Sequence, residues 1–215
     1  MRLKINQISL SSISLLLFRR YKSVSLYENV RTMTFTAIDF ETAHACFPCQ
    51  IGLTHVENGQ ITESASWLIK PACFPYMNPH NERVHSISSF DLKDAPTFEE
   101  LWSELHFRLE DSILVAHNAA FDIGVLRSVL QYYDLAKPWT EYFCSLGLSR
   151  KVWKGLPNGH SLGNLCAHHN IHFRHHDAGD DAAACAQLTL KAFNSIGAVN
   201  LENGLELAGI NLKKL

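Results

Sequence analysis

The sequence predicts an α/β fold with a mixed β-sheet covered by helices. Three β-rich runs come first, at residues 34–40, 50–56 and 61–70. A short, wholly apolar run at residues 113–116 has the composition of a parallel strand that is buried on both faces. After it, helical periodicity alternates with short strand-like segments, which favours a parallel extension of the first three strands.

Length and composition indicate one well-buried domain. The chain has 215 residues, of which 47% are hydrophobic and 19% charged, and these are ordinary values for a globular protein. The formal net charge of -2 argues against a strongly nonspecific duplex binder, because such binding depends on many lysine and arginine contacts to phosphates. The charge is compatible with a local nucleic-acid site.

The first three strands are expected to form an antiparallel meander. Asn58 and Gly59 separate the second strand from the third, and Asn-Gly between two strands is a hairpin signal. Residues 71–79 contain repeated prolines and predict a loop. Thr97 and Glu100 form a capping box, which opens a helix that ends near residue 110.

The second half of the chain predicts the parallel part of the sheet. After the strand at residues 113–116, the expected elements are a helix to about residue 133, a strand at 139–144, short helices at 146–153 and 161–168, and a long helix at 179–195. A meander followed by alternating helices and parallel strands is the order of a ribonuclease H-like fold.

Both ends of the chain are expected to lie outside the main domain, which we place at residues 33–196. Residues 1–32 hold a short apolar run flanked by basic residues, with no acid before Glu28. We interpret them as a disordered leader or as sequence upstream of a natural start at Met33, with an organelle transit peptide as the alternative. Their apolar run is too short to span a bilayer. Residues 197–215 are a C-terminal tail.

Six cysteines are spread through the chain without a regular framework spacing, which favours reduced thiols and a cytoplasmic location. Cys46 and Cys49 form a C-x-x-C motif. A zinc site there needs two further ligands, and a redox site needs a thioredoxin-like context. The role of this pair therefore stays open.

Two acids lie two residues apart at the end of the first strand. Successive side chains of a strand point to opposite faces, so Asp39 and Glu41 present their carboxylates on the same face. Two close carboxylates stay ionised together only beside a cation, and their hard oxygen atoms suit Mg2+ or Mn2+. The alternative is an exposed strand end with two solvated acids.

Two more acids occupy the sheet-facing side of a helix in its first turn. The positions three, four, seven and eight residues after Asp122 are all apolar. Of the neighbours Asp180 and Asp181, only Asp181 shares its helix face with apolar side chains. A charged group on such a face costs about several kcal/mol unless it is paired, although helix capping is an alternative role for Asp122.

These acids are expected to meet beyond the carboxyl ends of the strands, where open α/β sheets bind ligands. With two divalent cations, such a cluster performs phosphoryl transfer. His176 lies five residues before Asp181, on the loop that enters the helix, and is suited to act as the general base. Because several histidines crowd residues 168–176, a surface histidine or a soft-metal site is the alternative.

Three motifs carry a resemblance to a known family. Asp-Phe-Glu-Thr at 39–42, His-Asn-Ala-Ala-Phe-Asp at 117–122 and His-Asp-Ala-Gly-Asp-Asp at 176–181 resemble, in order and spacing, the motifs of the DEDDh 3'-5' exonucleases. That family includes the proofreading epsilon subunit of bacterial DNA polymerase III, ribonuclease T and oligoribonuclease. The resemblance covers about residues 33–196.

The resemblance implies a role for each matching residue. Two metal ions, Mg2+ or Mn2+, are bound by Asp39, Glu41, Asp122 and Asp181. His176 is the general base; His175 with Asp180 has the same spacing, but the helix-face argument favours His176 with Asp181. The terminal nucleotide lies against Phe40, Thr42, Asn118 and Phe121.

The implied reaction is hydrolysis of the terminal phosphodiester at the 3' end of single-stranded DNA, with release of nucleoside 5'-monophosphates. Repair or proofreading is the implied role, and a DNA polymerase is a candidate partner. The alternatives are an RNA-trimming 3'-5' exoribonuclease and a catalytically silent nucleic-acid-binding module. Arg150, Lys151 and Lys154 around Trp153 are either contacts for the incoming backbone or an exposed helix end. No membrane association is expected, and the oligomeric state is open.

Overall fold

The structure is a computed structural model, and it describes residues 32–215. The leader expected at residues 1–32 therefore lies, except for Thr32, outside the described residues. The domain boundaries at residues 33 and 196 stay a prediction. No helix within the described residues is long and apolar enough to cross a membrane.

Within residues 32–215, six strands form one mixed sheet. They are β1 (Phe35–His44), β2 (Phe47–Glu57), β3 (Gln60–Leu68), β4 (Ile113–Ala116), β5 (Glu141–Cys144) and β6 (Lys213–Lys214). Their spatial order is β3-β2-β1-β4-β5-β6. The first three strands are antiparallel, β4 and β5 extend the sheet in parallel, and β6 is antiparallel to β5. The predicted mixed α/β sheet is confirmed.

The hairpin between β2 and β3 follows the predicted Asn-Gly signal. Asn58 has φ 54° and Gly59 has φ 78°, so both central residues are left-handed, as a tight two-residue hairpin turn requires. The hairpin between β1 and β2 is longer than predicted. The register of that pair shifts around Thr42, and the two strands continue past the shift to His44 and Phe47.

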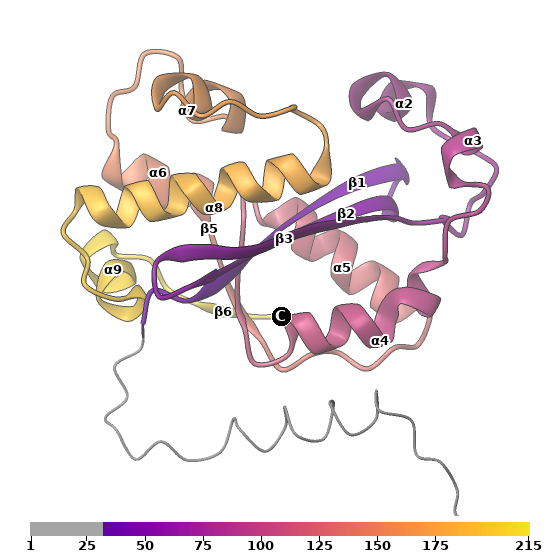
Figure 1. Ribbon diagram of the computed structural model, residues 1–215, viewed down its shortest axis with the longest axis horizontal. Coiled ribbons are helices and arrows are strands. Elements are labelled where there is room, and N and C mark those ends of the chain that lie inside the picture. The colour runs from indigo at the N-terminus through magenta and orange to yellow at the C-terminus, as the bar shows by residue number, and fades with distance from the viewer. Residues whose placement is uncertain (1–31) are drawn as a thin grey trace, which may run out of the picture. The chain divides into compact units, whose positions relative to one another are not determined.

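Helices cover both faces of the sheet (Figure 1). They are α2 (Pro79–His85), α3 (Ser89–Leu92), α4 (Phe98–Leu109), α5 (Ala120–Tyr132), α6 (Ser145–Val152), α7 (Leu162–His168), α8 (Ala178–Ser195) and α9 (Leu201–Ala208). One core lies between the sheet and α6 to α9, and a second lies between the sheet and α4 and α5. The predicted capping box of α4 is present: Glu100 accepts from the Thr97 backbone N–H at 2.7 Å.

The tail after residue 196 contributes to the fold. α9 adds Leu201, Leu205 and Ala208 to the core that also contains α8, and β6 extends the sheet beside β5. The short helices α2 and α3 follow the predicted loop at residues 71–79. α2 contacts the far end of β1, and Leu92 of α3 belongs to a third small core with Ala43 of β1 and Cys49 of β2.

The start of α8 lies directly on β2 because Gly52 has no side chain. A Cβ built at Gly52 would be 1.9 Å from the backbone oxygen of Ala178, the first residue of α8. Any larger residue would therefore displace the helix. This close approach brings the first turn of α8 over the middle of β1, where Asp39 and Glu41 lie.

Candidate active site

Three of the four predicted acids converge on one point. Carboxylate oxygens of Asp39, Glu41 and Asp181 all lie within 4.8 Å of one another. Strand alternation explains the first two, since Phe35 and Ala37 point into the core on the α8 side. Asp39 and Glu41 continue that row, and Asp181 reaches it from the first turn of α8.

Asp122, the fourth acid, approaches from the opposite side of β1. It lies in the first turn of α5, is only 1% exposed, and accepts a hydrogen bond from the Phe40 N–H at 3.0 Å. Asp122 is outside the group of three that share the 4.8 Å distance, but its charge contributes to the raised pKa of Asp39. The structure therefore places it beside the other acids, bound to the strand that carries two of them.

The carboxylates of this site disfavour their own ionisation. The pKa of Asp39 is well above its usual value because of burial and the nearby charges of Asp122 and Asp181. Burial, followed by the charge of Asp181, raises the pKa of Glu41 to about 8, and burial raises that of Asp122 to about 7. Burial also raises the pKa of Asp181.

This donor set fits a divalent cation. Within residues 32–215, no lysine or arginine forms an ion pair with Asp39, Glu41, Asp122 or Asp181. Two buried acids, Asp122 and Asp181, and two half-buried ones, Asp39 and Glu41, lie together without a lysine or arginine partner in the described part of the chain, so they need another positive charge to stay ionised. Hard carboxylate oxygens are the ligands that Mg2+ and Mn2+ prefer, so a divalent metal is the counter-charge that the site accommodates.

Two adjacent histidines lie at the entrance of α8. The His175 ring bonds to the carboxylate of Asp181 through Nδ1 at 3.2 Å, whereas His176 bonds to the same carboxylate through its backbone N–H at 3.1 Å. The His176 ring stacks on that of His175, with 3.9 Å between centroids, and its Nδ1 lies 3.9 Å from Glu41 Oε1. Burial and the charge of His175 lower the pKa of His176.

The predicted helix-face assignment of α8 agrees with the structure. Asp181 is 3% exposed and faces the sheet, while Asp180 accepts from the Arg174 N–H on the outer side. His176 is left-handed, with φ 66°, and this conformation turns its ring toward Glu41 and its N–H toward Asp181. Both histidines border the acids, so the choice of general base between them depends on their different bonds.

Two residues for which the sequence predicted no role fix the start of α8. Asp177 is the N-cap, and its Oδ1 accepts from the Asp180 N–H at 3.2 Å. The buried Gln50 of β2 accepts from the Ala178 N–H at 3.1 Å and donates to Asp177. An Asp three residues before a helical acid is a capping signal, so Asp177 was visible in the sequence, whereas nothing local marked Gln50.

The predicted nucleotide-binding residues are not equivalent. Phe40 is 2% exposed, and its ring packs in the core formed with α4 and α5 because it alternates with Asp39 and Glu41. The structure therefore does not bring the Phe40 ring to the acids, and only its N–H reaches Asp122. Asn118 and Phe121 are exposed at the start of α5, beside Asp122.

Thr42 is held by α2, which the sequence did not predict. Asn81 donates to both the backbone oxygen and the hydroxyl of Thr42, at 2.9 and 3.1 Å. His85 accepts from the Ile87 N–H through Nδ1, so its Nε2 carries the proton and donates to Thr42 O at 3.2 Å. These bonds fix the strand directly after the two acids.

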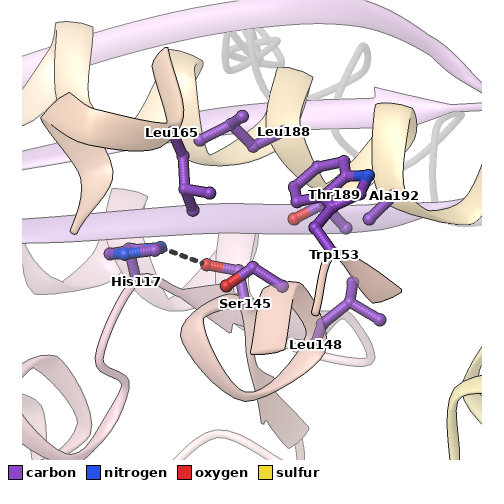
Figure 2. Close-up of a pocket in the computed structure, with 9 residues that line it drawn as sticks. His117, Ser145, Leu148, Trp153, Leu165, Leu188, Thr189 and Ala192 are labelled. Carbon is purple, nitrogen blue, oxygen red and sulfur yellow. Dashed lines mark hydrogen bonds between the residues drawn. The ribbon is translucent and has the colours of Figure 1, made fainter. Parts of the chain in front are cut away.

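His117, the first residue of the second motif, bonds to two other segments of the protein. Figure 2 shows its ring at a small pocket between α6, α7 and α8, joined to Ser145. Its Nε2 lies 2.9 Å from the backbone oxygen of His160, and its Nδ1 lies 2.9 Å from Ser145 Oγ. Burial lowers the pKa of His117 to about 4, so a neutral imidazole connects the turn before α5 to the segment before α7.

The cysteines do not form the alternative zinc site within the described residues. All six thiols are free, and no cysteine belongs to a group of side chains there that could hold a metal. Cys49 is buried, with its Sγ 3.7 Å from His85 Nε2. The cytoplasmic location stays a prediction.

Comparison with known proteins identifies the family. The profile of the family described as Exonuclease matches residues 36–189, which is more than half of the chain. The chain belongs to the exonuclease family. Its three motifs and its mixed sheet are therefore those of an exonuclease domain, as the resemblance to the DEDDh group implied.

Two curated relatives are much longer proteins, and this chain matches only a part of each. DNA polymerase III PolC-type of Oceanobacillus iheyensis is 30% identical over 194 aligned residues, and the match covers 85% of this chain and 13% of that protein. The 3'-5' exonuclease DinG of Staphylococcus epidermidis is 25% identical over 179 residues, 81% of this chain and 20% of that protein. The chain thus spans one fifth or less of the length of these relatives.

Solved structures show the same fold. Exonuclease X in complex with 5' overhanging duplex DNA has a TM-score of 0.66 and 24% identity, and the match covers 81% of this chain and 99% of that one. The nuclease domain of 3'hExo, a DEDDh family member bound to rAMP, has a TM-score of 0.68 and 11% identity over 87% of this chain and all of that domain, 100%.

Proposed function

We propose that this protein is a metal-dependent 3'-5' exonuclease that hydrolyses the terminal phosphodiester of single-stranded DNA and releases nucleoside 5'-monophosphates. The observation that carries the proposal is the convergence of Asp39, Glu41 and Asp181 within 4.8 Å, with Asp122 bound to the same strand. The raised pKa values of these acids indicate a site that needs a cation. Family membership is consistent with this chemistry.

Each side chain has a proposed task. Asp39, Glu41, Asp122 and Asp181 would hold two Mg2+ or Mn2+ ions, which supply a nucleophile at neutral pH and stabilise the developing charge when bound. His176 would take the proton of the attacking water, and its lowered pKa keeps the ring in the basic form at neutral pH. Thr42, Asn118 and Phe121 would line the pocket of the terminal nucleotide.

DNA is the preferred substrate class, and RNA is the second candidate. A DNA polymerase III and a 3'-5' exonuclease DinG are among the relatives, which favours DNA and a role in proofreading or repair. One structural neighbour recognises a histone mRNA stem-loop, which favours keeping RNA in the test. Discrimination depends on contacts to the 2'-hydroxyl, and association with a polymerase is part of the same proposal.

The decisive experiment uses four matched substrates: single-stranded DNA and RNA of one sequence, each labelled at the 3' or the 5' end. The purified protein is incubated with each strand and Mg2+, Mn2+ or chelator. We expect the 3' label to be released first as a mononucleotide, while the 5'-labelled strand shortens stepwise, and chelator should abolish both. Release of the 5' label first, or full activity in chelator, would contradict the proposal.

A matched pair of variants ties the activity to this site. Asp122→Asn should remove hydrolysis and preserve the circular dichroism spectrum, because it keeps the side-chain volume and one acceptor oxygen for the Phe40 N–H. Asp134→Asn, an exposed acid beyond the other end of α5, should leave the rate unchanged. Equal rates in the two variants would remove Asp122 from the mechanism.

A further inference from the structure

A stretch of the sequence without acids has contacts with the active site. From residue 142 to residue 176 the sequence contains no aspartate or glutamate, although the whole chain has 21 acids and a net charge of -2. The stretch comprises most of β5, all of α6 and α7, and the loop that enters α8. Its lysine and arginine residues are Arg150, Lys151, Lys154 and Arg174.

Three of these four cations form no ion pair with an acid in the part of the chain that the structure describes. Arg174 is paired with the Asp177 carboxylate, and its Nε lies 4.0 Å from Asp180. Arg150, Lys151 and Lys154 are exposed, and no ion pair within residues 32–215 involves them. An exposed cation without an acidic neighbour keeps its attraction for phosphate. We call these three residues the basic end of α6.

The basic end of α6 is connected to the active site by a chain of bonds. Ser149, next to Arg150, bonds through its hydroxyl to the His160 ring at 3.1 Å. The His160 carbonyl in turn lies 2.9 Å from the His117 ring, and His117 directly precedes Asn118. The charge of Arg150 is close enough to contribute to the lowered pKa of His117.

A second connection runs through α7. A Cβ built at Gly163, in the first turn of α7, would be 3.5 Å from the His175 ring, which is bonded to Asp181. Both α6 and α7 lie along α8 on one side of the sheet (Figure 1). A nucleic-acid strand that leaves the acid cluster on this side of the sheet therefore meets the acid-free stretch first.

This surface offers charge rather than aromatic stacking. The Trp153 ring lies between Lys151 and Lys154 in sequence, but it packs on His169 with 4.1 Å between centroids and lines the pocket of Figure 2. Its ring is thus partly buried and already packed against the protein. Contacts from lysine and arginine to phosphate fix the position of a strand without reading its bases.

We propose that Arg150, Lys151 and Lys154 bind the phosphate backbone of a single strand on the 5' side of its terminal nucleotide, independently of base sequence. This inference rests on the proposed function, which places the 3' end of that strand among the acids. The occupant is a polyanionic single strand, because three exposed cations on an acid-free stretch that leads from the proposed hydrolytic site complement its charge.

The test compares two triple variants with the same loss of charge. Arg150→Gln, Lys151→Gln and Lys154→Gln change the basic end of α6. Lys137→Gln, Lys213→Gln and Lys214→Gln change exposed lysines, one in the segment before β5 and two in β6. Binding of a fluorescein-labelled strand of about 20 nucleotides is measured by anisotropy in Ca2+ at several salt concentrations. Hydrolysis of this strand and of a dinucleotide is measured in Mg2+.

We expect only the α6 variant to bind the long strand more weakly. Its plot of log Kd against log salt should lose about 2 units of slope, since each phosphate contact on a single strand contributes about 0.7. Its KM should rise for the long strand and stay unchanged for the dinucleotide, which does not reach α6.

Other outcomes separate the two proposals. If the two triple variants match in affinity and salt slope, the basic end of α6 is not the backbone site. An equal KM increase on the dinucleotide would show a disturbed active site and would also overturn the inference. If the wild-type protein hydrolyses neither substrate, the proposed function fails, while the anisotropy series still decides where a strand binds.

Discussion

The helices α5 and α8 bring an acid to the same site in different ways. Each carries a buried aspartate in its first turn, Asp122 in α5 and Asp181 in α8. The start of α8 is fixed by side chains, with Asp177 as its cap and Gln50 bonded to its first N–H. The start of α5 has Ala119 at the cap position and no side-chain cap.

The two acids also differ in their hydrogen bonds, and again Asp181 has more partners from the protein than Asp122. Asp181 accepts from the His176 N–H and from the His175 ring, so the protein itself offsets part of its charge. Asp122 accepts from the Phe40 N–H and lies beside Asp39, whose pKa is raised by burial and by Asp122 itself. Histidine and backbone contacts thus offset part of the charge of Asp181, whereas no histidine bonds to Asp39 or Asp122 within residues 32–215 and burial raises the pKa of both.

The largest expected effect comes from removing either acid. Asp122→Asn and Asp181→Asn should each reduce hydrolysis on the order of 1,000-fold, because a lost ligand charge removes several kcal/mol of transition-state stabilisation. Asp180→Asn changes the neighbouring, outward acid of α8 and should retain most of the activity. Single-turnover rates measure all three. A larger loss for Asp180→Asn than for Asp181→Asn would favour the pairing of His175 with Asp180.

The two histidines of the α8 entrance give the next largest effect. His176→Ala should reduce kcat on the order of 100-fold, the contribution typical of a general base. His175→Ala should reduce the rate less, and it should move the acidic limb of the pH–rate profile upward, because the charge of His175 lowers the pKa of His176. A profile of kcat from pH 5 to about 9 distinguishes the two. An unaltered rate and profile in His176→Ala would exclude it as the base.

Local periodicity was sufficient for the parts of the site that depend on a single element. The alternation of β1 predicts that Asp39 and Glu41 share a face, and the helical period predicts Asp181 rather than Asp180 as the buried acid. Both follow from the geometry of one strand or one helix. The strands of the meander and the capping box of α4 were predictable for the same reason.

Contacts between distant segments could not be predicted in this way. Gln50 and Gly52 fix α8 from β2, more than a hundred residues earlier in the chain, and neither carries a local signal. The bonds of α2 to Thr42 likewise depend on a helix that the loop-like composition before it concealed. The ring positions of His175 and His176 depend on the left-handed backbone of His176, which a spacing argument does not contain.

The pH dependence of stability measures the mutual repulsion and burial of the acids on β1 and α5. In the metal-free protein, folding raises the pKa of Glu41 from 4.5 to about 8 and that of Asp122 from 3.8 to about 7. The folded state thus holds protons that the unfolded state releases. The contribution of these groups to stability is present below about pH 4 and is lost as the pH rises to about 8.

Thermal unfolding in chelator should therefore show a Tm that falls as the pH rises across this window. At pH 8, a divalent ion at 100 times its Kd should raise the Tm by about 5–10 °C, equivalent to about 2.7 kcal/mol. Asp122→Asn should flatten the decline in chelator and reduce the gain with metal. A Tm that rises with pH in chelator would show that the folded protein offsets the negative charge of the acids without a cation.

The smallest expected effect concerns the N-cap of α8. Asp177→Ala removes the cap of α8 and should lower the free energy of unfolding by about 1 kcal/mol in Mg2+, whereas Asp180→Ala removes an acid of the same turn and keeps the cap. The charge of Asp177 also contributes to the raised pKa values of Asp39 and Glu41, so its removal relieves some repulsion when no metal is present. The loss in urea unfolding should accordingly be smaller in chelator than in Mg2+. Equal losses in both conditions would mean that the cap of α8 and the acid cluster contribute independently to the free energy of unfolding.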